Sequence, residues 1–231
     1  MPGTPEDAGP APVLLRIAER GADARTREWL SNTLRAVRAG VSPDIFHGAF
    51  AGAARRLATA EFNPIPEEVG TLAAHGLDVG SWTAARAART GLLCELALSM
   101  RESVMMVGRL YRTGDNEERI AVLGALAVIH EPETYLDVAV EGCRTHVTPV
   151  FEAIACDNPY PSFHFPEPAF NQMVLKALFL AVSPSRITGL RARYNADLVR
   201  MLTAYADERR AAGRSRPPQV DWLLNLEVNE S

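Results

Sequence analysis

The chain has 231 residues, of which 47% are hydrophobic and 23% are charged, and its formal net charge is −4. This composition is typical of a globular protein that buries a core, and the length allows one large domain or two small ones. The acidic balance argues against a nucleic-acid binder and against a membrane-surface role, because phosphate contacts need a dense basic face.

Neither a membrane span nor a targeting segment is predicted. The longest apolar run, Ile120–Ile129, is far shorter than the roughly 20 residues that a spanning helix needs. Residues 1–12 carry four prolines, two glycines and two acids, with no basic region ahead of an apolar stretch. We therefore predict a disordered N-terminal tail over residues 1–12, no signal peptide and a cytoplasmic protein.

The periodicity of apolar residues predicts an all-α fold. Three-to-four spacing recurs along the chain, and no stretch combines period-two alternation with β-branched residues and hairpin turns. Helices are predicted in the first half at 13–20, 24–38, from Pro43 to about Leu57, at 67–74, and from a cap at Ser81 to Arg112 with a kink at Gly91 or Ser99.

In the second half, Asp115 followed by Glu118 predicts a capping box. Helices are then expected at 119–129, 133–144, from Thr148 to Ala155, at 168–182, and from a cap at Asn195 to Gly213. Short helices joined by tight turns suggest an antiparallel bundle or a HEAT-like α-α superhelical stack, although no fixed sequence period is present.

We predict one all-α domain over residues 13–231. Its parts are N-terminal helices over 13–112, a helical core over 113–213, and an exposed linker with a terminal clasp over 214–231. In the clasp, Trp222, Leu223, Leu224 and Leu226 are expected to pack back on the bundle.

Familiar catalytic and metal-binding motifs are absent from the sequence. Cys143, His146, Cys156 and His164 could supply zinc ligands, but nine and seven residues separate the later members, whereas structural zinc sites favour closely spaced pairs. Neither a nucleophile elbow nor a glycine-rich phosphate loop occurs. We predict no metal, no cofactor and no catalytic residue, and we expect the three cysteines to be unpaired.

The most unusual segment is Asp157–Pro168, in which four prolines stiffen a loop that is rich in aromatic and hydrogen-bonding side chains. The helix that follows carries Asn171, Gln172 and Lys176 on an apolar background, and such polar groups are expensive to bury without partners. Lys176 is the only lysine among 24 basic residues.

Two interpretations of this region stay open. In one, it is a structural corner in which Lys176 pairs with Asp157 or Glu167. In the other, it forms a small-molecule pocket, since a few polar groups on an apolar background are the usual anatomy of such sites. The candidate ligand-binding residues are Asp157, Asn158, Tyr160, His164, Asn171, Gln172 and Lys176.

Several sequence strings resemble the EboA family. They are Gly114–Ala121, Tyr135–Ala139, Phe151–Ala155, Asp157–Pro161 and Asn171–Phe179. The resemblance runs from about Asp115 to Gly213, and the Asn-Pro-Tyr-Pro and Asn-Gln-Met-Val-Leu-Lys strings are its most specific parts. The chain departs from the family pattern at Phe170, where a tryptophan is expected, and in the variable stretch 162–164.

The resemblance implies a product of a bacterial gene cluster for secondary metabolism, whose neighbours look like a UbiA-type prenyltransferase, a sugar-phosphate isomerase, a TatD-like hydrolase and a dehydroquinate synthase. It also implies a role in metabolite traffic, and it brings no catalytic residues. Our first hypothesis is a non-enzymatic protein that binds a metabolite or docks on the cluster's membrane enzyme. The alternatives are an enzyme that uses Lys176, His164 and Asp157, and a purely structural scaffold.

Overall fold

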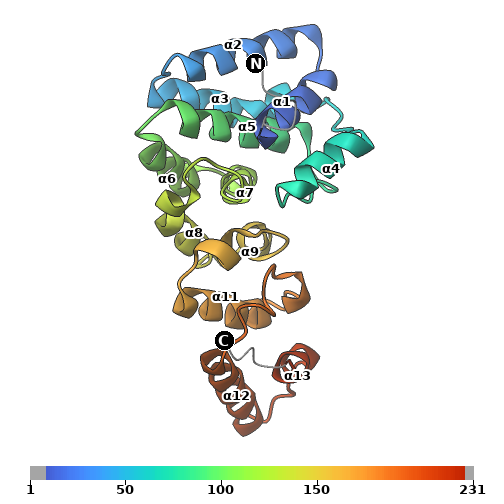
Figure 1. Ribbon diagram of the computed structural model, residues 1–231, viewed down its shortest axis with the longest axis vertical. Helices are drawn as coiled ribbons and strands as arrows, with labels where there is room; N and C mark the ends of the chain where they lie inside the picture. The colour runs from blue at the N-terminus through green and yellow to red at the C-terminus, as the bar shows by residue number, and fades with distance from the viewer. Residues whose placement is uncertain (1–8, 227–231) are drawn as a thin grey trace, which may run out of the picture. The chain divides into compact units, whose positions relative to one another are not determined.

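The computed structural model describes residues 9–226, and within them it contains helices and no strand, so the predicted all-α class is confirmed (Figure 1). The chain forms two compact units, one ending at Ala139 and one beginning at Val140. The subdivision at residues 112/113 that we predicted within one domain falls inside the first unit, and the single domain over 13–231 stays a prediction. Residues 1–8 of the predicted tail lie outside the described residues, whereas Pro10–Pro12 already belong to the first helix.

Over its described residues, 9–139, the first unit contains seven complete α-helices. They are α1 (Pro10–Arg20), α2 (Ala24–Arg38), α3 (Pro43–Arg56), α4 (Pro66–Ala74), α5 (Ala84–Ser99), α6 (Ser103–Thr113) and α7 (Asn116–Ala125). A 3-10 helix, η2 (Pro132–Tyr135), follows, and α8 (Leu136–Gly142) runs across the border between the units.

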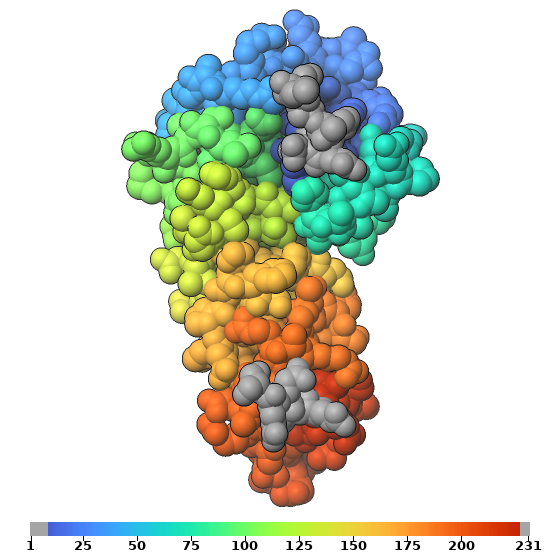
Figure 2. All heavy atoms as spheres, in the orientation of Figure 1, coloured from blue at the N-terminus to red at the C-terminus, as the bar shows by residue number. Residues whose placement is uncertain are grey.

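Helix α5 is the centre of the first unit. It packs against α1, α2, α3, α6 and α7, and every residue from Ala87 to Leu96 is buried. Gly91 allows the closest approach, because a Cβ there would lie 2.6 Å from Leu15 Cγ of α1. Helix α4 packs on α1. It lies at one edge of the unit in Figures 1 and 2.

Ion pairs fasten the outer helices to this core. Arg38 of α2 binds the buried Glu95 of α5 through two hydrogen bonds of 2.8 Å. Arg89 of α5 is itself buried, and its Nη2 lies 3.4 Å from Oε1 of Glu118 on α7. These bonds link α5 to its neighbours on two sides.

The helix ends follow the local capping chemistry. The predicted capping box is present, with Glu118 N donating to Asp115 Oδ1 at 2.8 Å and Asp115 N donating to Glu118 Oε2 at 3.1 Å. The cap of α5, however, is Thr83 and not Ser81, because Thr83 accepts the bond from Arg86 N. The long run to Arg112 is also interrupted, since Met100 is extended and separates α5 from α6.

The second unit begins within α8 and, as far as residue 226, continues through five further α-helices. They are α9 (Thr148–Ala155), α10 (Tyr160–His164), α11 (Glu167–Phe179), α12 (Ala196–Ala211) and α13 (Pro218–Leu224), with a 3-10 helix, η3 (Pro184–Arg186), after α11. Helix α11 packs against α9, η3 and α12, and α13 packs on α12. Leu223 is fully buried and accepts a 2.6 Å hydrogen bond from Tyr194 on its carbonyl, while Trp222 stays 37% exposed.

Among residues 9–226, no helix combines the length and the apolar character that crossing a membrane requires. A HEAT-like order of the helices stays a prediction.

Candidate functional site

The proline-rich segment is more ordered than the stiff loop that we predicted. Tyr160–His164 form the short helix α10, and Pro168 lies in the first turn of α11. Prolines at the first positions of a helix lose no hydrogen bond, since those amides have no partner within the helix. The segment therefore contains the helix α10, a turn and the start of the helix α11.

Arg193 holds this segment to the rest of the second unit. Its guanidinium donates to the carbonyls of Ser162 at 2.7 Å and Phe165 at 2.8 Å, and it lies 4.7 Å from the ring centre of Phe170. Gly189 lets the backbone approach this segment closely. Its φ is +73°, and a Cβ at this position would lie 1.9 Å from Ser162 Oγ.

Three predicted site residues stabilise α10 from within. Asn158 is 4% exposed, donates to Ala153 O at 2.9 Å and accepts from Tyr160 N at 2.9 Å. The buried ring of Tyr160 packs on His164, with 4.6 Å between the ring centres, and edge-on against Phe165. The ring contacts lie within the segment, whereas the bond to Ala153 O connects Asn158 to α9.

Asp157 forms an exposed ion pair with Arg186. The carboxylate accepts from Nε at 2.9 Å and from Nη2 at 2.7 Å, and Arg186 also reaches Glu152 at 3.2 Å. These carboxylates raise the pKa of Arg186. Lys176 pairs with neither Asp157 nor Glu167 in the described residues, so the pairing expected for a structural corner is not found.

Replacing Asp157 should have a small effect on stability. Exposed ion pairs contribute about 0–1 kcal/mol, so we expect Asp157→Ala to lose less than about 1 kcal/mol of unfolding free energy. Asp157 has a φ of +52°, which favours glycine. Asp157→Gly should therefore be about 1 kcal/mol more stable than Asp157→Ala in urea denaturation. Equal stability of the two variants would contradict backbone strain at this position.

Asn171 is 1% exposed, and its amide pairs with that of Asn195. Each amide donates to the other at 3.1 Å. Asn195 is also the predicted cap of α12, since its Oδ1 accepts from Leu198 N at 2.8 Å. Asn171 thus connects α11 to the start of α12.

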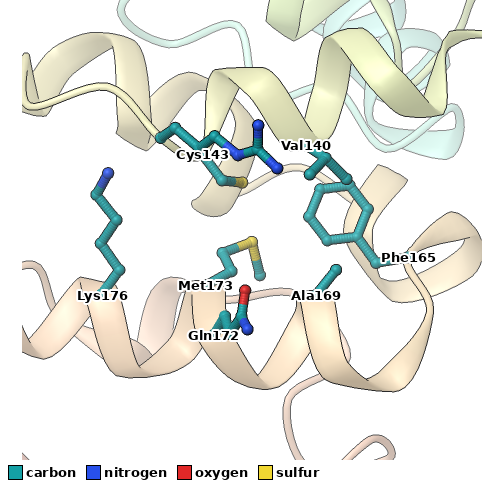
Figure 3. A pocket seen from close by; sticks show the side chains of 8 residues that line it. Val140, Cys143, Phe165, Ala169, Gln172, Met173 and Lys176 are labelled. Carbon is teal, nitrogen blue, oxygen red and sulfur yellow. The ribbon is translucent and has the colours of Figure 1, made fainter.

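Gln172 and Lys176 lie on a different face of α11, where they line an open hollow of about 250 Å³ (Figure 3). The hollow belongs to the second unit, and its other lining residues are Val140, Cys143, Arg144, Phe165, Ala169 and Met173. Figure 3 shows Val140 and Cys143 on one side and Ala169, Gln172, Met173 and Lys176 rising from α11 on the other. Of the seven predicted residues, the structure brings these two together at one cavity.

The charges of the hollow are uncompensated. Within the described residues, the side chains of Lys176 and Arg144 have no ion-pair or hydrogen-bond partner. The Lys176 ammonium lies 5.7 Å from the ring centre of Phe151. Loss of hydration lowers the pKa of Lys176 from the usual 10.5, and the smaller electrostatic effect of Cys143 raises it. An ammonium in this position has donors available for a bound molecule.

Cys143 is a half-buried thiol on the wall of the hollow. Burial raises its pKa to about 12, and nearby Lys176 lowers it by a smaller amount. The thiol is therefore protonated at neutral pH, which is unlike a catalytic nucleophile. Cys94 and Cys156 are buried, and no group of three His, Cys, Asp or Glu side chains among residues 9–226 is placed to hold a metal ion.

Four features of the hollow were missed from the sequence. Cys143 and Arg144 lie in the turn after α8, which ends at Gly142 and not at residue 144 as predicted, and Phe165 and Met173 fit a general apolar pattern. The apolar spacing placed Cys143 on an inward face, but nothing in the sequence shows that α8 ends opposite α11.

The comparisons with known proteins identify the family. A family model described as metabolite traffic protein EboA matches residues 12–225, a longer stretch than the strings near 115–213. Comparison with curated proteins and with solved structures gave no match. Since the family model covers nearly the whole described chain, this protein belongs to the EboA family of metabolite traffic proteins.

Proposed function

We propose that this protein binds a small metabolite in the hollow between α8 and α11 and carries it without changing it chemically. The observation that supports the proposal most is the composition of the hollow. The polar ends of Gln172, Lys176 and Arg144 surround a surface formed by Phe165, Met173 and other apolar groups.

Binding sites for small molecules have this anatomy, in which an apolar wall provides affinity and a few polar groups fix the orientation. The volume of about 250 Å³ lies just below the roughly 300–1,000 Å³ of pockets for drug-sized ligands. The metabolite should accordingly be small, or be held by only one of its ends. Handling of a metabolite agrees with the description of the family.

The contacts favour binding over catalysis. The acid-base set that we considered, Lys176, His164 and Asp157, is not gathered at one place. Asp157 is paired with Arg186, His164 packs on Tyr160, and only Lys176 lines the hollow. General acid-base catalysis requires its groups within hydrogen-bond reach of one substrate.

Ligand protection of Cys143 tests the proposal directly. The full chain is incubated with a small-molecule extract of the cells that produce it, and alkylation of each cysteine by excess iodoacetamide is followed by mass spectrometry. The reaction is run for hours at about pH 9, because the raised pKa of Cys143 leaves only a small fraction of reactive thiolate. We expect the extract to slow alkylation of Cys143, because a bound molecule covers the hollow wall. Alkylation of the buried Cys94 and Cys156 should be slow with and without the extract.

Two variants sharpen this test. Lys176→Met keeps the length of the side chain and removes the ammonium, so it should weaken protection by about tenfold in extract concentration, as expected for the loss of one charged hydrogen bond. Arg200→Ala removes a charge from the exposed pair with Asp197 and should leave protection unchanged. Unchanged alkylation of Cys143 in the presence of the extract would refute the proposed function.

A further inference from the structure

The charged side chains that line the hollow have one sign. Arg144 lies in the turn after α8, and Lys176 lies on α11. No Asp or Glu is among the eight lining residues. The nearest acids in sequence are engaged or remote: Glu141 has a partner of its own, and Glu167 is exposed at the opposite end of α11 from Lys176.

Cations without counter-charges raise the energy of the empty site. Like charges that share a hollow repel each other, and partial burial removes part of the water that would otherwise solvate them. The Phe151 ring compensates Lys176 in part, since its face attracts a cation, but this contact is weaker than a contact with an anion. An acid group placed between Arg144 and Lys176 would relieve both effects.

The remaining wall selects for an apolar body. Val140, Phe165, Ala169 and Met173 present no side-chain hydrogen-bonding group to the hollow, apart from the weakly accepting thioether of Met173. Figure 3 shows the Phe165 ring and Ala169 at one end of the hollow and Lys176 at the other. The Gln172 amide lies between these ends and can donate to an acid group or accept from a hydroxyl.

On the basis of the proposed function, we infer that the ligand is a small organic anion in which a carboxylate or phosphate group is attached to an apolar body. Arg144 and Lys176 bind the acid group, and Phe165 and Met173 bind the apolar body. A guanidinium forms paired hydrogen bonds with a carboxylate and with a phosphate, so organic carboxylates and organic phosphates form one class of ligand for this site.

Four probes of known structure test this class. Phenylacetate and phenyl phosphate carry both an acid group and an apolar ring, phenylacetamide is the neutral counterpart of phenylacetate, and inorganic phosphate has no apolar body. Dissociation constants come from calorimetry and from protection of Cys143 against iodoacetamide. We expect at least one organic anion to bind about tenfold or more tightly than phenylacetamide and inorganic phosphate.

The variants Arg144→Met and Lys176→Met should each weaken binding of the organic anion by about tenfold and leave binding of phenylacetamide unchanged. Added salt should weaken binding of the anion to the native protein, because screening reduces the attraction between the charges. Thermal denaturation of both variants checks that they are folded. Both side chains reach solvent, so little loss is expected.

The outcomes separate this inference from the proposed function. Equal binding of phenylacetamide and the organic anions would overturn the anion class while leaving a metabolite-binding protein. The same conclusion follows if the cell extract protects Cys143 equally in the native protein and in both methionine variants. If the cell extract does not protect Cys143 in the native protein, the proposed function itself is wrong.

Discussion

Replacing Arg89 by methionine is expected to lower the free energy of unfolding by about 3–5 kcal/mol, because it leaves a buried carboxylate without its partner. Arg89 is 2% exposed in the middle of α5. Its Nε donates to Phe50 O at 2.9 Å, and its Nη2 lies 3.3 Å from Ala51 O and 3.4 Å from Glu118 Oε1. The variant would therefore weaken the contacts of α5 with both α3 and α7.

Arg86 provides a matched control on the same helix. It lies three residues before Arg89, and its guanidinium is 4.3 Å from the ring centre of Trp82. Its Nε is buried and has no hydrogen-bond partner within the described residues, and burial lowers the pKa of the side chain to about 10. The attraction of Glu117 and Asp78 opposes this desolvation only in part, so replacing the poorly hydrated charge of Arg86 by an apolar side chain should cost little unfolding free energy.

Guanidinium denaturation followed by circular dichroism distinguishes the two arginines. We expect Arg89→Met to unfold at a lower denaturant concentration than the native protein, and Arg86→Met at the same or a higher concentration. Equal losses in both variants would show that the aliphatic stems, and not the ion pair with Glu118, provide the stability of this region.

The helices were predicted well where the capping signals are local. Helix α2 was predicted at 24–38 and is found there, because Asp23 accepts from Thr26 N at its start and Gly40, with a φ of +89°, follows its end. The end of α5 was less certain. Gly91 and Ser99 were equally plausible break points, and packing against Leu15 keeps Gly91 inside the helix.

The candidate site was predicted less completely, because its polar residues have partners that are distant in the sequence. The sequence shows that Asp157 and Asn171 are unusual on their background, but not that Arg186 and Asn195 satisfy them 29 and 24 residues away. Gln172 and Lys176 line the hollow because they point away from these contacts. The opposite wall comes from the end of α8, and this juxtaposition depends on tertiary packing.

Arg193 is expected to be the main residue that keeps the proline-rich segment in place. Arg193→Ala removes two short charged hydrogen bonds, to the Ser162 and Phe165 carbonyls, and the stacking on Phe170. At roughly 1.5–3 kcal/mol for each charged bond, less the water that replaces it, the loss of unfolding free energy should be about 2–4 kcal/mol. Arg193→Lys should lose less, since one ammonium can retain one of the two bonds.

Arg193→Ala should also weaken ligand binding in the hollow. Phe165 lines it, and the Phe165 carbonyl is one of the groups that Arg193 holds. A less fixed Phe165 ring should bind the apolar body of phenylacetate more weakly, so that Cys143 is protected less in Arg193→Ala than in the native protein. Arg200→Ala, on the exposed face of α12, is the matched control, with an expected loss below about 0.5 kcal/mol and unchanged protection. If Arg193→Ala and Arg200→Ala unfold together and protect Cys143 equally, the other contacts of the segment, such as those of Asn158 and Tyr160, are enough to fix it, and Arg193 has no part in forming the hollow.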